Sequence, residues 1–124
     1  MRPVFIAALL ALPLPALAQD SPAPQRIEVR LSSFAFAPRE IRLIAGRPAI
    51  LHLVNTSGGG HNFSAPEFFA AATHVTGPVS AGAVEVPGQR SVDIRLTPAR
   101  GTYRLRCTHT MHTAFGMRGT ITVE

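Results

Sequence analysis

Residues 107–117, near the C-terminus, contain five side chains with sulfur or imidazole donor atoms. His61 lies far upstream, directly after three consecutive glycines. A loop that supplies Cys, His and Met, joined by a distant His, offers two nitrogens, one thiolate and one thioether. This donor set predicts a mononuclear copper site for one-electron transfer. The five donors in the loop are Cys107, His109, Met111, His112 and Met117.

Cys107 is the only cysteine among 124 residues, so the chain cannot form an internal disulfide. The N-terminus has Arg2, then an almost purely apolar run over 4–17, then small residues at 16 and 18. This pattern predicts a secretory signal peptide, residues 1–18, cleaved after Ala18. The run is too short and too rich in proline to span a bilayer comfortably. In a periplasmic or secreted protein, a lone thiol is expected to be cross-linked, reactive or bound to a metal.

Composition limits the possible classes of protein. The length allows one domain, and 46% hydrophobic with 15% charged residues argues against a disordered chain. Twelve arginines outnumber seven acidic residues. Because an exported protein is unlikely to meet nucleic acid, this charge points to acidic protein partners or anionic surfaces.

The elements that must position the donors read as β-strands. Apolar residues alternate with polar ones, a pattern that indicates strands with one face on a core. Many prolines and glycines separate these segments, which predicts an all-β, antiparallel sandwich or barrel. Cys107 shares a strand face with Tyr103 and Leu105, so its sulfur is expected to point inward. The segments are 27–31, 41–43, 51–53, 92–96, 103–107 and 121–123.

One stretch favours a helix. Ser64 and Glu67 have the spacing of a capping box, and alanines follow, so we expect a short helix near 64–72. Phe68 and Phe69 are expected to form satellite core beneath it. Residues 19–25 are polar and rich in proline, which predicts a flexible lead-in before a domain over 26–124.

The pattern G-H-N-F, followed much later by G-T-Y-x₃-C-x₄-H-x₄-M-x-G-T-I-T-V, resembles the cupredoxin family of plastocyanin- and azurin-like blue copper proteins. The resemblance spans Ile27 to Val123. It implies a Greek-key β-sandwich and one type 1 copper ion that cycles between Cu(I) and Cu(II). It also implies that Asn62 hydrogen-bonds between the ligand loops and steadies the thiolate. The implied ligands are His61, Cys107, His112 and Met117.

The loop departs from the family pattern by its extra His109 and Met111. The Cys-x-His spacing to His109 is too tight for the family, whereas Cys-x₄-His fits longer-loop members, so His112 is the favoured ligand. His109 and Met111 are then either surface residues without a role or a transient copper-handling patch at the rim of the site.

The sequence therefore predicts an exported electron carrier, monomeric and not an enzyme, because one closed site offers no substrate position. Redox partners are expected to dock near His112, Ala114 and Phe115, where an apolar collar surrounds the ligand. The alternative is a copper chaperone that uses the same site plus His109 and Met111. A zinc site of one Cys and three His, including His109, and a metal-free binding sandwich remain open.

Overall fold

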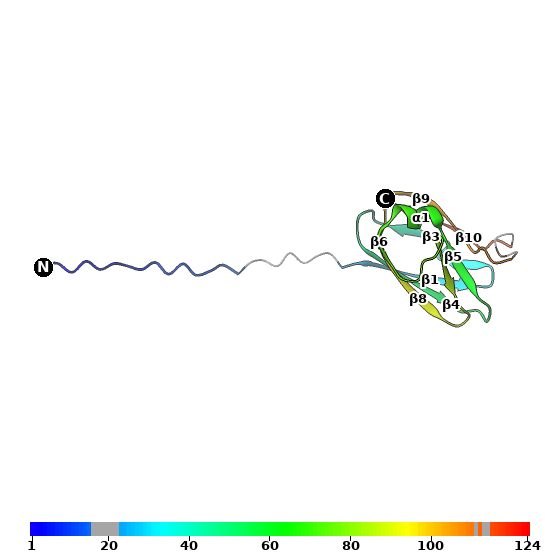
Figure 1. The fold of residues 1–124 in the computed structure, drawn as a ribbon, viewed down its shortest axis with the longest axis horizontal. Coiled ribbons are helices and arrows are strands. Elements are labelled where there is room, and N and C mark those ends of the chain that lie inside the picture. Colours follow the sequence, from blue (N-terminus) through cyan, green and yellow to red (C-terminus); the bar gives the residue numbers. More distant parts are fainter. Residues whose placement is uncertain (16–22, 111, 113–114) are drawn as a thin grey trace.

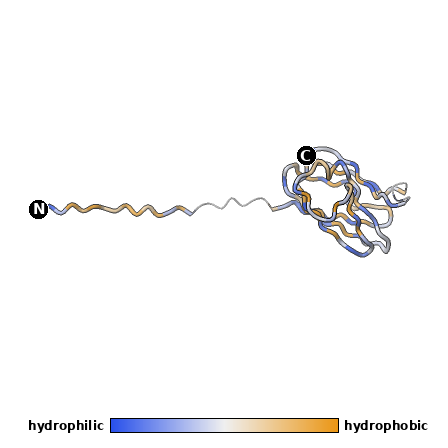
Figure 2. The backbone as a smooth tube through the Cα atoms, in the orientation of Figure 1, coloured by the Kyte–Doolittle hydropathy of each residue, from blue (hydrophilic) through white to orange (hydrophobic). Residues whose placement is uncertain are grey.

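The computed structural model describes residues 1–15, 23–110, 112 and 115–124. Two five-stranded sheets pack face to face, and apolar residues line the space between them (Figures 1 and 2). The first sheet has the order β2-β1-β4-β8-β6, and the second β3-β10-β9-β5-β7. The first contains β1 (Gln25–Ser32), β2 (Ala35–Ala37), β4 (Ala49–Asn55), β6 (Thr73–Thr76) and β8 (Ser91–Thr97). The second contains β3 (Glu40–Leu43), β5 (His61–Ser64), β7 (Ala83–Val86), β9 (Gly101–Arg106) and β10 (Arg118–Val123).

The alternation in the sequence corresponds to the two faces of several strands. In β9, for example, Leu105 is buried while Arg104 and Arg106 are exposed. Cys107 follows the same alternation and is fully buried, as predicted. The predicted sandwich and its single short helix are confirmed. Strands β2, β5, β6 and β7 are additional elements that the alternation did not predict.

The pairing of the strands is mixed, where the sequence predicted an antiparallel sandwich. Strand β1 pairs with β4 in parallel, and β10 pairs with β3 in parallel. The reason is the path of the chain, which turns back in β2, crosses to the other sheet as β3, and returns as β4 in the direction of β1. All other strand pairs are antiparallel.

Helix α1 (Pro66–Ala71) is shorter than the predicted 64–72. Its first residue is proline. An N–H at the first position of a helix has no acceptor within the helix, so proline, which lacks the N–H, loses no hydrogen bond there. The predicted capping box does not form, because Ser64 belongs to β5 and no side chain caps the helix. Phe68 and Phe69 are buried against the main core rather than in a separate cluster. Among the described residues, no helix has the length and apolar character needed to cross a bilayer.

The N-terminal residues 1–15 form no helix or strand and are exposed (Figure 1). The predicted cleavage position after Ala18 and most of the predicted lead-in lie outside the described residues, so the division of the chain stays a prediction. Strand β1 begins at Gln25. The Gln25 side chain donates to the carbonyls of Ile44 and Arg47 and accepts from the Ile44 N–H.

Arginines gather on the outer face of β9 and β10. Arg106 lies directly opposite Arg118. Arg104 is two residues before Arg106 and lies on the same exposed face. No ion pair joins any of these three to an acidic group among the residues described in the structure. Like charges that face each other across strands destabilise a sheet, so this face carries a built-in repulsion.

The opposite outer face contains a cross-strand His–Asp pair. His52 on β4 lies opposite Asp93 on β8, and 2.5 Å separates the imidazole Nδ1 from the carboxylate. The hydrogen bond from His52 lowers the pKa of Asp93, despite a smaller opposing effect of burial. Because the pKa is lower in the folded state, the pair stabilises the fold above the unfolded pKa. That stability is lost as the pH falls through the folded pKa.

Replacing His52 with valine is therefore expected to raise the pKa of Asp93 towards its ordinary value. Valine suits a half-buried strand position but offers no donor. The carbon resonance of the Asp93 carboxyl, followed by NMR through an acid titration, measures the change. An identical titration curve in both proteins would show that His52 does not hold the carboxylate ionised.

Candidate metal centre

Three of the predicted donors meet at one end of the sandwich. His61 begins β5, Cys107 directly follows β9, and His112 lies in the loop between β9 and β10. The Cys107 sulfur is 3.2 Å from Nδ1 of His112 and 3.9 Å from Nδ1 of His61. The two Nδ1 atoms are 3.1 Å apart. Residues from two separate segments thus aim their donor atoms at one point.

These separations fit a single metal ion. Bonds of about 2.0 Å to imidazole and about 2.3 Å to thiolate place the donor atoms roughly 3.3–3.7 Å apart around one ion. The observed separations of 3.1, 3.2 and 3.9 Å bracket that range. Among the described residues, His61, Cys107 and His112 are the group that could hold a metal. Together with Met117, this arrangement is typical of a type 1 copper site.

Burial prepares the donors for metal binding. His61 is 4% exposed and Cys107 is fully buried, which keeps bulk water away from two of the three donors. Burial, followed by the nearby imidazoles of His112 and His109, lowers the pKa of His61 below its ordinary value. A lowered pKa keeps the ring neutral near pH 7, and the neutral imidazole is the form that binds metals.

Met117 is fully buried at the end of the same loop. Its backbone N–H donates to the carbonyl of His112 over 3.0 Å, and its carbonyl accepts from the Cys107 N–H over 3.1 Å. These two bonds close the loop, so that Cys107, His112 and Met117 are held together by their own backbone. The backbone of Met117, whose side chain carries the thioether, is therefore held next to that of Cys107.

Asn62 connects the two segments that supply the donors. Its backbone N–H donates to the Cys107 sulfur over 3.4 Å. Its side-chain oxygen accepts from the Thr108 N–H over 2.8 Å, and its side-chain nitrogen donates to the Thr108 hydroxyl over 2.7 Å. Asn62, which follows His61, is thus hydrogen-bonded to Thr108, which follows Cys107. This is the arrangement that the family resemblance implied for Asn62.

The glycine-rich turn before His61 is held by a buried amide. Asn55 is 1% exposed, and its side-chain nitrogen donates to the carbonyls of Gly59 and Val86, each over 2.9 Å. Its side-chain oxygen accepts from the Ser57 N–H and hydroxyl. A Cβ at Gly88 would lie 2.3 Å from the Gly58 carbonyl oxygen, so this approach requires glycine. The fixed turn sets where β5 begins and therefore where His61 lies.

His109 lies outside the donor group, and its ring is next to those of both histidine donors. Its Nε2 is 2.8 Å from a carboxylate oxygen of Glu85 on β7. The other oxygen of Glu85 accepts from the Asn62 side chain over 2.9 Å. Burial alone would raise the pKa of Glu85, but the hydrogen bonds from Asn62 and His109 outweigh it and lower the pKa. The second extra donor, Met111, lies outside the described residues.

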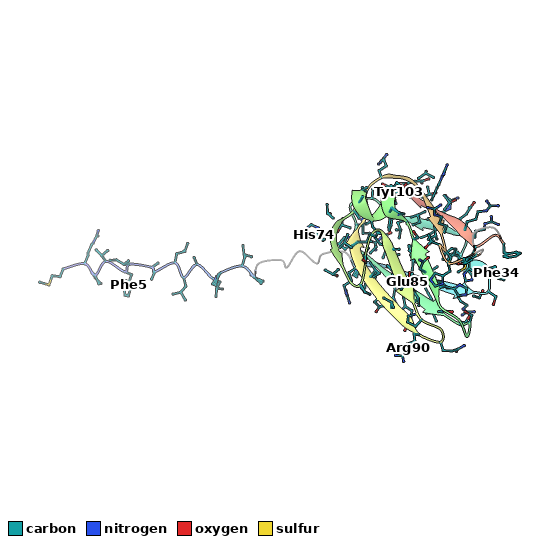
Figure 3. All side chains as sticks on the ribbon, turned by 45° about the vertical axis from the view of Figure 1, so that its right-hand side comes forward. Phe5, Phe34, His74, Glu85, Arg90 and Tyr103 are labelled. Carbon is teal, nitrogen blue, oxygen red and sulfur yellow. The ribbon has the colours of Figure 1, made fainter. Side chains whose placement is uncertain are left out.

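Sequence reasoning missed Glu85. The signal was present, because Val84, Glu85 and Val86 alternate as a strand does, but its pairing with β5 is non-local. The register of β5 and β7 places Glu85 opposite Asn62, and Figure 3 shows Glu85 on the body of the sandwich.

Two exposed aromatic rings lie beside His112. The Phe34 ring meets the His112 ring edge to face at 5.2 Å and lies 5.1 Å from the Phe115 ring. Phe34 is 42% exposed and Phe115 62%. An open hollow of about 310 Å³ is lined by Phe34, His61, His109 and His112 together with the glycine-rich turn. Figure 3 places Phe34 at the end of the sandwich opposite His74.

The apolar collar is thus partly as predicted. Phe115 belongs to it, Ala114 lies outside the described residues, and Phe34 is an addition that the sequence did not reveal. Phe34 comes from the turn between β1 and β2, far from the loop in sequence.

Comparison with known proteins gives a consistent family. The family model described as a cupredoxin-like domain matches residues 3–123. Auracyanin B is similar in structure, with 29% identity, a TM-score of 0.62, and coverage of 82% of this chain and 91% of that chain. Auracyanin A, a "blue" copper protein from Chloroflexus aurantiacus, has 23% identity and a TM-score of 0.58, with coverage of 82% and 100%.

A larger protein shares only the fold. The multicopper oxidase McoA of Aquifex aeolicus has 17% identity and a TM-score of 0.66, and the match covers 85% of this chain but 30% of the oxidase. No curated protein sequence matches this chain.

Proposed function

Because the chain belongs to the family of cupredoxin-like domains, we propose that it is an exported one-electron carrier. In this proposal His61, Cys107, His112 and Met117 hold one copper ion. The observation that carries it is the convergence of one thiolate and two Nδ1 atoms to within 3.9 Å of one another at a buried point. The signal peptide predicted over residues 1–18 supports export to the periplasm or the outside of the cell.

Copper bound by such a donor set can be reduced and reoxidised with little rearrangement of its ligands. The chain's own contribution is to fix those ligands beforehand. The Asn62 N–H donates to the Cys107 sulfur, which holds the sulfur in place. The bonds between Met117 and the loop backbone hold the fourth donor's residue in place. Burial of His61 and Cys107 excludes water, which tunes the potential of the site.

His112 provides the shortest route from the donor group to the surface. It is the only half-buried member of the group of three, and its ring borders the open hollow. The exposed ring of Phe34 lines that hollow, and the exposed ring of Phe115 lies 5.1 Å from the Phe34 ring, so the two form an apolar surface next to the hollow. We propose that redox proteins dock on this collar, centred on Phe34, His112 and Phe115, and that the carrier works as a monomer without enzymatic activity of its own.

Adding Cu(II) to the purified mature protein tests the proposal. We expect an intense absorption band in the visible region, from charge transfer between the Cys107 sulfur and copper, at one copper per chain. The band should disappear on reduction and return on reoxidation over repeated cycles. A protein that binds copper without this band under oxidising conditions would contradict the assignment of the site.

A copper chaperone is the second candidate, and one observation favours it. The side chain of His109 is 32% exposed and lines the same hollow as His61 and His112, so an incoming ion could meet a third imidazole at the rim. A Cu(I) chelator separates the two functions. A carrier should retain copper for hours in excess chelator, whereas a chaperone should release it within minutes.

A further inference from the structure

His109 is close enough to the donor group to compete for the metal. Its ring centroid lies 5.5 Å from that of His112 and 6.5 Å from that of His61. Its carbonyl accepts from the His112 N–H over 3.1 Å, so the backbone itself brings the two rings together. Met117 is a weak donor in a type 1 copper site. A third imidazole, that of His109, would complete with Cys107 and the other two histidines the tetrahedral set of strong donors that zinc prefers.

One carboxylate holds this ring away. Glu85 Oε2 is 2.8 Å from His109 Nε2, and no other hydrogen bond to the His109 side chain is present among the described residues. The other carboxylate oxygen, Oε1, binds the Asn62 side chain, which in turn bonds to Thr108. Glu85 is therefore linked to two consecutive residues that follow Cys107, to Thr108 through Asn62 and to His109 directly.

In the part of the chain that the structure describes, the Glu85 side chain makes these two hydrogen bonds and no others. Its side chain is 66% exposed, so it contributes little to the core, and its two bonds both run towards the metal centre. A substitution at an exposed position usually changes stability little. Each oxygen of the Glu85 carboxylate accepts one hydrogen bond, Oε1 from Asn62 and Oε2 from His109.

We propose that Glu85 is a positioning residue that keeps His109 outside the donor group and thereby favours copper over zinc at this site. The inference rests on the proposed ligand set of His61, Cys107 and His112. It does not require that the protein carry electrons. Glu85 touches no metal donor itself and acts through His109 and Asn62.

Four variants test this role: E85A, H109A, the double variant E85A/H109A, and E28A. Glu28 is a matched control, because it is an exposed carboxylate on the other sheet whose ion pair with Arg30 spans 3.8 Å. The readouts are the ratio of zinc to copper affinity, measured by competition, and the NMR signals of the His109 ring in the metal-free protein.

We expect E85A to raise the zinc-to-copper affinity ratio by about tenfold or more, because changes in groups that orient metal ligands shift metal affinity by about 10–100-fold. The double variant should return to the ratio of H109A, since the competing ring is gone. E28A should behave as the unchanged protein. In metal-free E85A, the His109 ring signals should shift, which reports loss of the 2.8 Å contact without any metal.

Two outcomes would overturn the proposal: an unchanged ratio in E85A, or a ratio that stays altered in E85A/H109A. The second would mean that Glu85 acts through Asn62 alone. If E85A does not fold, as judged by circular dichroism, E85Q replaces it and should give a smaller increase, because glutamine keeps one of the two acceptor oxygens that Asn62 and His109 use. A wild-type protein without the visible band would refute the carrier function and leave the zinc and NMR results interpretable.

Discussion

Replacing Cys107 with serine is expected to abolish the intense visible band completely and to weaken copper binding by more than about 100-fold. Changes outside a donor set already cost about 10–100-fold in affinity, and this change removes the soft donor itself. A serine hydroxyl stays protonated near pH 7 and cannot supply the sulfur-to-copper transition. Absorption spectra and a competition titration with a chelator of known affinity measure the two effects.

The loop contains its own matched pair of controls. His109→Ala removes an imidazole that lies outside the donor group and should leave the band in place. His112→Ala removes one whose Nδ1 is 3.2 Å from the Cys107 sulfur and should lose it. If the band is lost in His109→Ala and kept in His112→Ala, then His109 and not His112 is the copper ligand.

Replacing Phe63 with alanine is expected to lower the free energy of unfolding by about 3–5 kcal/mol, the cost of truncating a buried phenylalanine. Phe63 is fully buried on β5, and its ring lies 6.1 Å from that of Phe36 and 6.0 Å from that of Phe69. It thus bridges the first sheet and the helix. Since small domains have total stabilities of about 5–15 kcal/mol, this loss is a large fraction of the whole.

Urea denaturation of the metal-free protein measures this loss. Phe63→Leu keeps most of the apolar volume and should cost far less, which separates the effect of the cavity from that of the aromatic contacts. Because Phe63 is two residues from His61, the alanine variant should also weaken copper binding. A loss below about 1 kcal/mol would mean that the neighbouring rings close the gap, which full burial argues against.

Much of the fold could be predicted from local patterns. Alternation of apolar and polar residues in segments such as 92–96 and 103–107 located strands and pointed Cys107 inward. The spacing within 107–117 identified Cys107, His112 and Met117 as ligands of one site, because residues of one short loop must lie close together. The short range of these relationships explains the success, since each pattern is contained within a few residues.

What the sequence did not reveal depends on contacts between distant segments. The parallel pairing of β1 with β4 follows from a crossing between sheets that no local pattern records. Phe34 approaches His112 from a turn 78 positions earlier in the chain. Glu85 acquires its role only through the register of β5 and β7. Each of these residues looks ordinary until its partner is placed beside it.

The opposed arginines on β9 and β10 have a consequence for how the protein responds to its surroundings. Arg106 and Arg118 are each one residue from a predicted copper ligand, Cys107 and Met117, so their repulsion acts at the base of the loop. Dissolved salt screens such repulsion, over about 10 Å at 0.1 M ionic strength. The loop that carries the predicted ligands should therefore be held least firmly on β9 and β10 at low ionic strength. Added salt should stabilise this end of the sandwich.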